Sequence, residues 1–173
     1  MAIYIMLTTL TDEGRKWVRK YGKFRREIEK AVFNITFTFV VFYLIFIILP
    51  VQGPRVQLPG AIGMPRPGYI FAPFFEWLFN TMGIAGAAFP SSHCGVATVV
   101  FLMSAKYIPR AAPVVAIFVV LLFCATVYGR FHYAVDVFYG IGLGAICYIL
   151  APYVRQALIK SGFTGPNGLP EKD

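Results

Sequence analysis

Four apolar stretches constrain the fold of this chain more than any other feature of its sequence. The first covers residues 31–50 without a charged side chain, and the others cover residues 91–105, 111–129 and 137–154. A helix needs about 20 residues to cross roughly 30 Å of hydrocarbon, so the second stretch is short unless its flanks extend it. Backbone groups in lipid must be hydrogen-bonded within the segment, and the alternation typical of a barrel strand is absent. The four stretches therefore predict transmembrane helices.

The composition indicates the same class. The chain has 173 residues, of which 58% are hydrophobic and only 14% are charged. A soluble domain of this length has no core large enough to bury so much apolar surface, which leaves a lipid bilayer as the solvent. We therefore expect an all-α protein, a polytopic membrane helix bundle with about four spans.

The lysines and arginines are distributed unevenly about these spans. Of sixteen, eight lie between residues 15 and 30. If that segment is cytosolic, thirteen fall on the cytosolic side and three, Arg55, Arg66 and Arg130, fall on the other, as the positive-inside rule predicts. Contact with anionic lipid headgroups explains the basic run, so the net charge of +8 gives no reason to expect a nucleic-acid partner. The sequence predicts an integral protein of the cell or inner membrane.

This topology divides the chain into three parts. Residues 1–30 form a cytosolic basic juxtamembrane segment, residues 31–154 form the membrane bundle, and residues 155–173 form a polar tail. Within the bundle, residues 51–89 form an outer segment, in which the aromatic stretch 69–82 suits a helix lying in the membrane interface. Two roles are equally open for this helix: it could simply pack over the ends of the membrane helices, or it could act as a lid that binds lipid.

The two histidines of the chain, His93 and His132, lie at predicted membrane boundaries on the outer face, with Asp136 beside the second. Titratable groups are costly at membrane depth and therefore mark candidate functional sites. A lone histidine commonly serves packing or hydrogen bonding, but both histidines here lie among polar residues on one side of the membrane. Residues far apart in the sequence thus converge on one extracytoplasmic site.

These three side chains have the chemistry of phosphoryl transfer. His132 and Asp136 are four residues apart and share one face of a helix. A carboxylate that accepts a hydrogen bond from one ring nitrogen makes the other nitrogen a better nucleophile or base. His93 comes from a different span and could protonate a leaving alkoxide.

Four further residues are candidates for binding the phosphate. Ser91 and Ser92 stand at a predicted helix start, where free N–H groups and the helix dipole favour an anion. Arg55 and Arg130 can neutralise phosphoryl oxygens through charge-assisted hydrogen bonds. The rival interpretation is a metal site made by the histidines and the carboxylate, but the arginines would repel a cation. The three cysteines are unclustered, so we expect neither a metal nor another cofactor.

Three short motifs in this region resemble those of a known family. Residues 89–93, FPSSH, resemble the P-S-x-H motif of the type 2 phosphatidic acid phosphatase superfamily, and residues 130–136, RFHYAVD, resemble its final motif with the core H-x3-D. Residues 50–55, PVQGPR, resemble the variant first motif of the branch that includes inositol phosphorylceramide synthases. The motifs occur in the family's order and on the expected membrane side. Together they are specific, whereas any one alone is weak.

The chain also departs from the family's usual pattern. The usual first motif is K-x6-R-P, but the R-P pair at residues 66–67 has a proline where the lysine belongs, so the phosphate-binding role passes to Arg55. The usual last motif has an arginine six residues before the histidine, where Thr126 stands here, and Arg130 is the candidate replacement. Members usually have six spans, so the chain resembles a shortened or N-terminally truncated form of that fold.

The resemblance implies a mechanism that needs no metal. His132 would attack phosphorus and form a phosphohistidine, Asp136 would orient it, and His93 would protonate the leaving lipid alcohol. Water would then release the phosphate, so the expected function is that of a lipid phosphate phosphatase acting on a phosphomonoester or diphosphate of a membrane lipid. If a second alcohol replaced water, the chain would be a lipid head-group phosphotransferase. A non-catalytic member of the family is the remaining alternative.

Overall fold

The computed structural model describes residues 12–57, 73, 77, 81 and 87–161 of the chain. The helices in chain order are α2 (Asp12–Ile48), α3 (Pro54–Gln57), α6 (Ser92–Tyr107), α7 (Ala112–Tyr128) and α8 (Ala134–Lys160). Within the described residues, strand-like pairing is limited to a parallel bridge between Val51 and Ala87. The prediction of an all-α membrane fold is confirmed.

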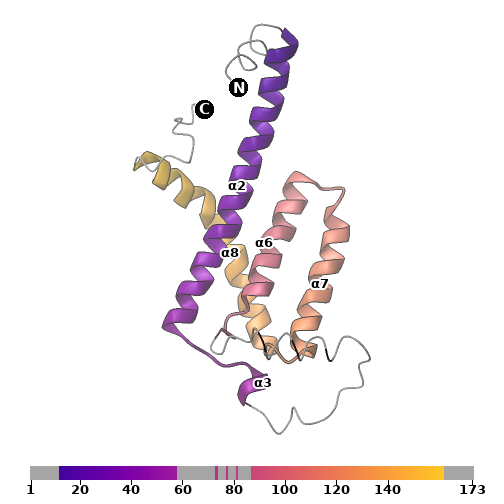
Figure 1. Ribbon diagram of the computed structural model, residues 1–173, viewed down its shortest axis with the longest axis vertical. Helices are drawn as coiled ribbons and strands as arrows, with labels where there is room; N and C mark the ends of the chain where they lie inside the picture. Colours follow the sequence, from indigo (N-terminus) through magenta and orange to yellow (C-terminus); the bar gives the residue numbers. More distant parts are fainter. Residues whose placement is uncertain (1–11, 58–72, 74–76, 78–80, 82–86, 162–173) are drawn as a thin grey trace.

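The central helix of the bundle is α6, which packs against α8, α2 and α7 (Figure 1). Fully buried side chains come from three of these helices, namely Phe42 from α2, Cys94 and Val99 from α6, and Cys147 from α8. In contrast, α7 packs mainly on α6 and buries little of its own surface. The core therefore lies where α2, α6 and α8 meet.

Small residues allow the backbones of α6 and α8 to approach closely. A Cβ atom on Gly140 would meet the carbonyl of Ser91, and one on Gly144 would meet the backbone of Gly95. On the other side of α6, a Cβ atom on Gly95 would meet the ring of Phe42 in α2. Close backbone approach through small residues is a common way for helices to associate in membranes. These contacts fix the first turns of α6 against the first turns of α8.

Two of the described helices are long and apolar enough to cross a bilayer, Phe24–Ile48 within α2 and Ala134–Lys160. The apolar helix α7 has 17 residues and α6 has 16, fewer than the about 20 that a span usually needs. Large hydrophobic side chains are nevertheless exposed along α2, α7 and α8, for example Ile47, Phe118 and Phe138. Apolar side chains on the outside of a helix bundle are suited to contact with lipid tails.

The predicted division of the chain corresponds to the helices only in part. The basic segment and the first apolar stretch belong to one helix, since α2 continues from Asp12 to Ile48 without a break at residue 30. Similarly, α8 continues to Lys160, past the predicted end of the bundle at residue 154. Most of the aromatic segment 69–82, and residues 162–173 of the tail, lie outside the described residues. The interfacial helix thus stays a prediction.

Candidate functional site

A turn after α7 positions the second histidine. The carbonyl of Thr126 accepts hydrogen bonds from the N–H groups of Phe131 and His132, at 3.1 and 3.3 Å. Arg130 adopts a left-handed backbone conformation with φ of 58°, which is uncommon for a residue with a side chain. Thr126, which stands where the family usually has an arginine, therefore serves here to close the end of α7 and to hold the backbone of His132.

The side chain of His132 is buried, with 6% of its surface exposed. Its Nδ1 atom lies 2.7 Å from the carbonyl oxygen of Ala88. A carbonyl oxygen can only accept, so Nδ1 donates a proton and the neutral ring keeps its lone pair on Nε2. Burial lowers the pKa of His132 below its usual value, and the charge of neighbouring His93 acts in the same direction, against the Ala88 carbonyl and Asp136. His132 is consequently neutral at pH 7, with Nε2 available as a nucleophile.

Asp136 lies next to this ring but makes its closest hydrogen bond elsewhere. Its Oδ2 atom accepts the N–H of Tyr133 at 2.7 Å and lies 3.8 Å from Nδ1 of His132. The sequence predicted that this carboxylate would hold the imidazole, whereas the shortest contact of Nδ1 is with Ala88. Sequence reasoning missed Ala88 because a residue that acts through its backbone carbonyl leaves no signature in its side chain.

His93 joins the site from α6, where it is the second residue of the helix. The ring centroids of His93 and His132 are 6.0 Å apart, with 59° between the ring planes. The side chain of His93 is exposed, in contrast to buried His132. The two histidines, predicted to converge from different spans, are thus neighbours, and His93 is the one that solvent can reach.

The two serines before His93 have different environments. Ser91 is fully buried, its Oγ accepts the N–H of Cys94 at 3.4 Å, and its own N–H donates to the carbonyl of Asp136 at 3.1 Å. Ser91 therefore caps α6 and ties it to α8. Half-buried Ser92 is the first residue of α6, where N–H groups lack a partner within the helix and favour an anion.

The segment that resembles the first motif is attached beside the same turn. Val51 accepts a hydrogen bond from the N–H of Ala88 at 3.0 Å. A Cβ atom on Gly53 would lie 2.6 Å from the carbonyl oxygen of Phe131, so glycine is needed for this close approach. The hydroxyl of Tyr133 donates to Gln57 Oε1 at 3.3 Å. Three segments that are separate in the sequence therefore meet around His132.

The two predicted arginines are placed by their backbones. Arg55 lies in α3, although its side chain is outside the described part of the structure, and half-buried Arg130 lies two residues before His132. Their roles as phosphate ligands stay predictions. Among the described residues, no three side chains of histidine, cysteine, aspartate or glutamate gather as a metal site would require.

Comparison with known proteins shows which family this chain resembles. Residues 17–150 match a family model described as PAP2 superfamily. Over 130 residues the chain is 26% identical to a PA-phosphatase related-family protein of Dictyostelium discoideum. The matched region makes up 73% of this chain and 24% of that protein. The chain thus spans about a quarter of the length of this relative. No solved structure matches the chain.

Proposed function

The chain belongs to the PAP2 superfamily, and we propose that it is a membrane phosphatase that hydrolyses a phosphomonoester or diphosphate of a lipid through a phosphohistidine intermediate. Family membership and the two long apolar helices indicate a membrane protein with phosphatase-type activity. The observation that carries the finer proposal is the hydrogen bond from His132 Nδ1 to the Ala88 carbonyl. It leaves Nε2 as the basic atom of a ring whose centroid lies 6.0 Å from that of His93.

In the first step, the Nε2 lone pair of His132 forms a bond to phosphorus while the bond from phosphorus to the lipid oxygen breaks. Protonated His93 donates its proton to that oxygen, so the lipid leaves as a neutral alcohol. In the second step, His93 takes a proton from water, whose oxygen forms a bond to phosphorus while the bond from phosphorus to Nε2 breaks, so that phosphate leaves and His132 returns to its neutral form. The two steps need one imidazole that acts as the nucleophile and one that gives and takes a proton. Buried His132 and exposed His93 suit these two roles.

The positive charge that develops on His132 during attack has two neighbours that stabilise it. The Nδ1–H group keeps its hydrogen bond to the Ala88 carbonyl, and the Asp136 carboxylate lies 3.8 Å from Nδ1. We assign Asp136 an electrostatic role for this reason, since its hydrogen bond to the Tyr133 N–H keeps it fixed there. The N-terminus of α6 and the two arginines, Arg55 and Arg130, are proposed to receive the phosphoryl oxygens.

The proposed site faces the extracytoplasmic side of the membrane. The N-terminal ends of α6 and α8 lie at the end of the bundle where α3 is drawn, and the turn between α6 and α7 lies at the opposite end (Figure 1). His93 is in the first turn of α6 and His132 lies just before α8. Lys106 and Arg110 are near that turn, and Arg155 and Lys160 follow the apolar part of α8. By the positive-inside rule, the basic end is cytosolic.

The test is release of phosphate from a panel of lipid phosphates by the purified protein in lipid nanodiscs, with His132→Ala as the control. We expect turnover by the wild type and a phosphohistidine that is labile in acid and stable in base. Turnover by His132→Ala at a substantial fraction of the wild-type rate would rule out the nucleophile. Adding candidate acceptor alcohols separates the phosphatase from a head-group transferase, because only a transferase forms a new phosphodiester. The transferase is the second candidate function, since residues 50–55 and 132–136 resemble the synthase branch.

A further inference from the structure

A second polar site lies at the other end of the bundle from the histidines. A cavity of about 610 Å³ is formed there by α2, α6 and α8. Its lining includes three basic residues, one from each helix: Lys30, Lys106 and Arg155. The proposed chemistry at His132 uses none of them.

A bend in α8 accounts for the cavity. Pro152 lies inside α8 and lines the cavity together with Tyr148. Proline has no N–H to donate to the carbonyl four residues earlier, and its ring displaces that turn, so it kinks a helix. Figure 1 shows that the C-terminal part of α8 changes direction and moves away from the axis of its first turns. At the level of this bend, side chains from α2, α6 and α8 line the cavity.

The charges in the cavity favour an anion. Lys30 is paired with Glu27, with 3.2 Å between Nζ and Oε1. Lys106 adds a further positive charge, and the guanidinium of Arg155 belongs to the same lining. Among the described residues of the lining, Glu27 is the one acid. Phe33 and Met103 are also part of the lining, so the cavity combines positive charge with apolar walls. An amphiphile with an anionic head matches this combination better than an inorganic ion does.

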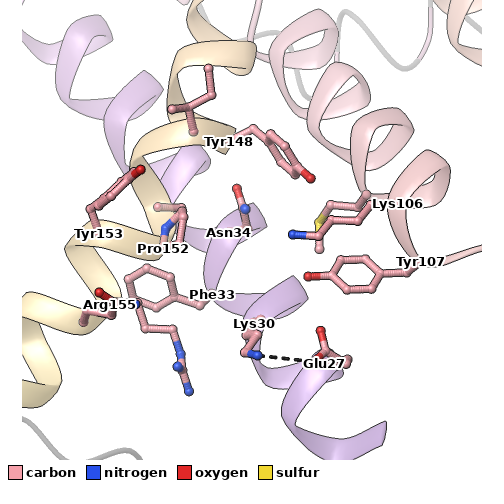
Figure 2. A pocket seen from close by; sticks show the side chains of 14 residues that line it. Glu27, Lys30, Phe33, Asn34, Lys106, Tyr107, Tyr148, Pro152, Tyr153 and Arg155 are labelled. Atoms are coloured by element: carbon pink, nitrogen blue, oxygen red, sulfur yellow. Dashed lines mark hydrogen bonds and ion pairs between the residues drawn. The ribbon is translucent and has the colours of Figure 1, made fainter. Parts of the chain in front are cut away.

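Asn34 specifies the ligand further. This side chain is 8% exposed, lines the cavity, and has a buried Oδ1 atom that finds no hydrogen-bond partner among the described residues. A buried acceptor without a donor is costly, so a ligand that brings a hydroxyl group would relieve that cost. Figure 2 shows Asn34 of α2 and Lys106 of α6 directed toward the middle of the cavity, with Lys30 and Glu27 joined at its edge.

We propose that this cavity binds the headgroup of an anionic phospholipid that carries free hydroxyl groups. The phosphodiester would lie against Lys106 and Arg155, one headgroup hydroxyl would donate to Asn34 Oδ1, and the glycerol backbone and acyl chains would lie along the apolar walls. The proposed phosphatase removes a terminal phosphate, which a phosphodiester lacks, so under that function this ligand occupies the second site as a bound lipid and not as substrate.

The experiment measures binding of phosphatidylglycerol to the full chain in phosphatidylcholine nanodiscs. Phosphatidylpropanol, which has the same charge and no headgroup hydroxyl, serves as the matched lipid. We expect the wild type to prefer phosphatidylglycerol. Lys106→Gln should weaken binding of both lipids by roughly fivefold, the effect of about one basic contact at a membrane surface. Arg110→Gln is the matched control, because Arg110 lies near the same end of the bundle but does not line the cavity.

Asn34→Leu tests the hydroxyl contact. Leucine has a similar size and no polar atom, so the variant should fold at least as stably as the wild type. It should lose the preference for phosphatidylglycerol while binding phosphatidylpropanol as before. An unchanged preference in Asn34→Leu, or equal losses in Lys106→Gln and Arg110→Gln, would overturn the proposal in favour of unspecific surface charge.

Two further arms separate the possible origins of the effect. Soluble glycerophosphoglycerol, added to the protein with bound phosphatidylglycerol, competes if the headgroup alone is recognised and fails to compete if the acyl chains are required. His132→Ala should bind phosphatidylglycerol as the wild type does, because the two sites lie at opposite ends of the bundle. Loss of binding in His132→Ala would place the lipid in the histidine site and contradict a second site.

Discussion

The Nδ1 atom of His132 donates its proton to the backbone carbonyl of Ala88, 2.7 Å away, across 44 residues of sequence. Ala88 is itself held by a hydrogen bond from its N–H to Val51, so the position of the imidazole depends on backbone groups of two other segments. A backbone carbonyl, like a carboxylate, can set the tautomer of a histidine. The consequences can be measured.

Replacing Asp136 by asparagine should reduce activity but not abolish it. In sites where a carboxylate alone fixes the tautomer of the catalytic histidine, this change costs about 10⁴-fold in kcat. Here the Ala88 carbonyl still accepts the hydrogen bond that keeps the proton on Nδ1, so we expect a clearly smaller loss, due to the missing negative charge beside the phosphohistidine. The measurement is kcat for a lipid phosphate in steady state. A loss of 10⁴-fold or more, in a variant that folds normally, would show that Asp136 and not Ala88 sets the tautomer.

The two histidines should respond differently to the leaving group. His132→Ala should abolish turnover of every substrate, because no covalent intermediate can form. His93→Ala should lose about 10²–10⁴-fold with a lipid phosphate, but much less with a nitrophenyl phosphate, whose leaving group needs no proton. Rates for both substrates with both variants provide the comparison. Equal losses for His93→Ala on the two esters would contradict its role as the general acid.

The pH dependence should reflect the lowered pKa of His132. Burial shifts this pKa below the ordinary value of 6.5, so the unfolded chain binds more protons than the folded chain between the two values. The contribution to folding stability is therefore complete above about pH 6.5 and is lost as pH falls toward the folded pKa. The acid limb of kcat/KM that belongs to His132 should also lie below pH 6.5. Thermal unfolding should depend less on pH over this range in His132→Gln, and an equal dependence would refute the assignment.

The contact between α6 and α8 should tolerate no added methyl group at Gly140. An alanine there would place its Cβ against the Ser91 carbonyl, and overpacking of this kind typically costs about 1–3 kcal/mol. Gly142 provides the matched control, because a Cβ atom there has nothing within 4 Å, and alanine favours a helix by about 1 kcal/mol over glycine. Unfolding in detergent should show Gly140→Ala destabilised and Gly142→Ala unchanged or stabilised. Similar stabilities for both variants would argue against the close helix contact.

The proposed orientation predicts which ends of the helices a label can reach. A membrane-impermeant maleimide added outside intact cells should modify a cysteine at Gln57, at the end of α3, but not a cysteine at Arg110. Permeabilised cells should permit labelling at both positions. The unmodified chain is the control for its three native cysteines, of which Cys94 and Cys147 are buried. Labelling at Arg110 from outside, with Gln57 protected, would reverse the orientation and place the histidines on the cytosolic face.

Much of this architecture follows from the sequence alone. The length of the apolar stretches determines helices, since a backbone in lipid has few other ways to satisfy its hydrogen bonds. The spacing of His132 and Asp136 predicts that their side chains lie close together, and they do at 3.8 Å, although His132 precedes α8 and so does not share a helix face with Asp136. The motifs around His93 and His132 identify the family that the comparison confirms. These features depend on local periodicity and on the identity of side chains, both of which are written in the sequence.

Other features depend on contacts between distant segments. The helical continuation of the basic segment into α2 shows that a boundary in charge need not be a boundary in structure. The partner of His132 is a backbone carbonyl supplied by Ala88, and every residue has such a carbonyl, so no residue type could indicate which one would be used. The second cavity likewise depends on Pro152 bending α8 beside Asn34 and Lys106. The sequence by itself determined the helices and the chemical groups. The tertiary structure decided which backbone atoms orient those groups, because this depends on the close contacts between segments at Gly53, Gly95 and Gly140.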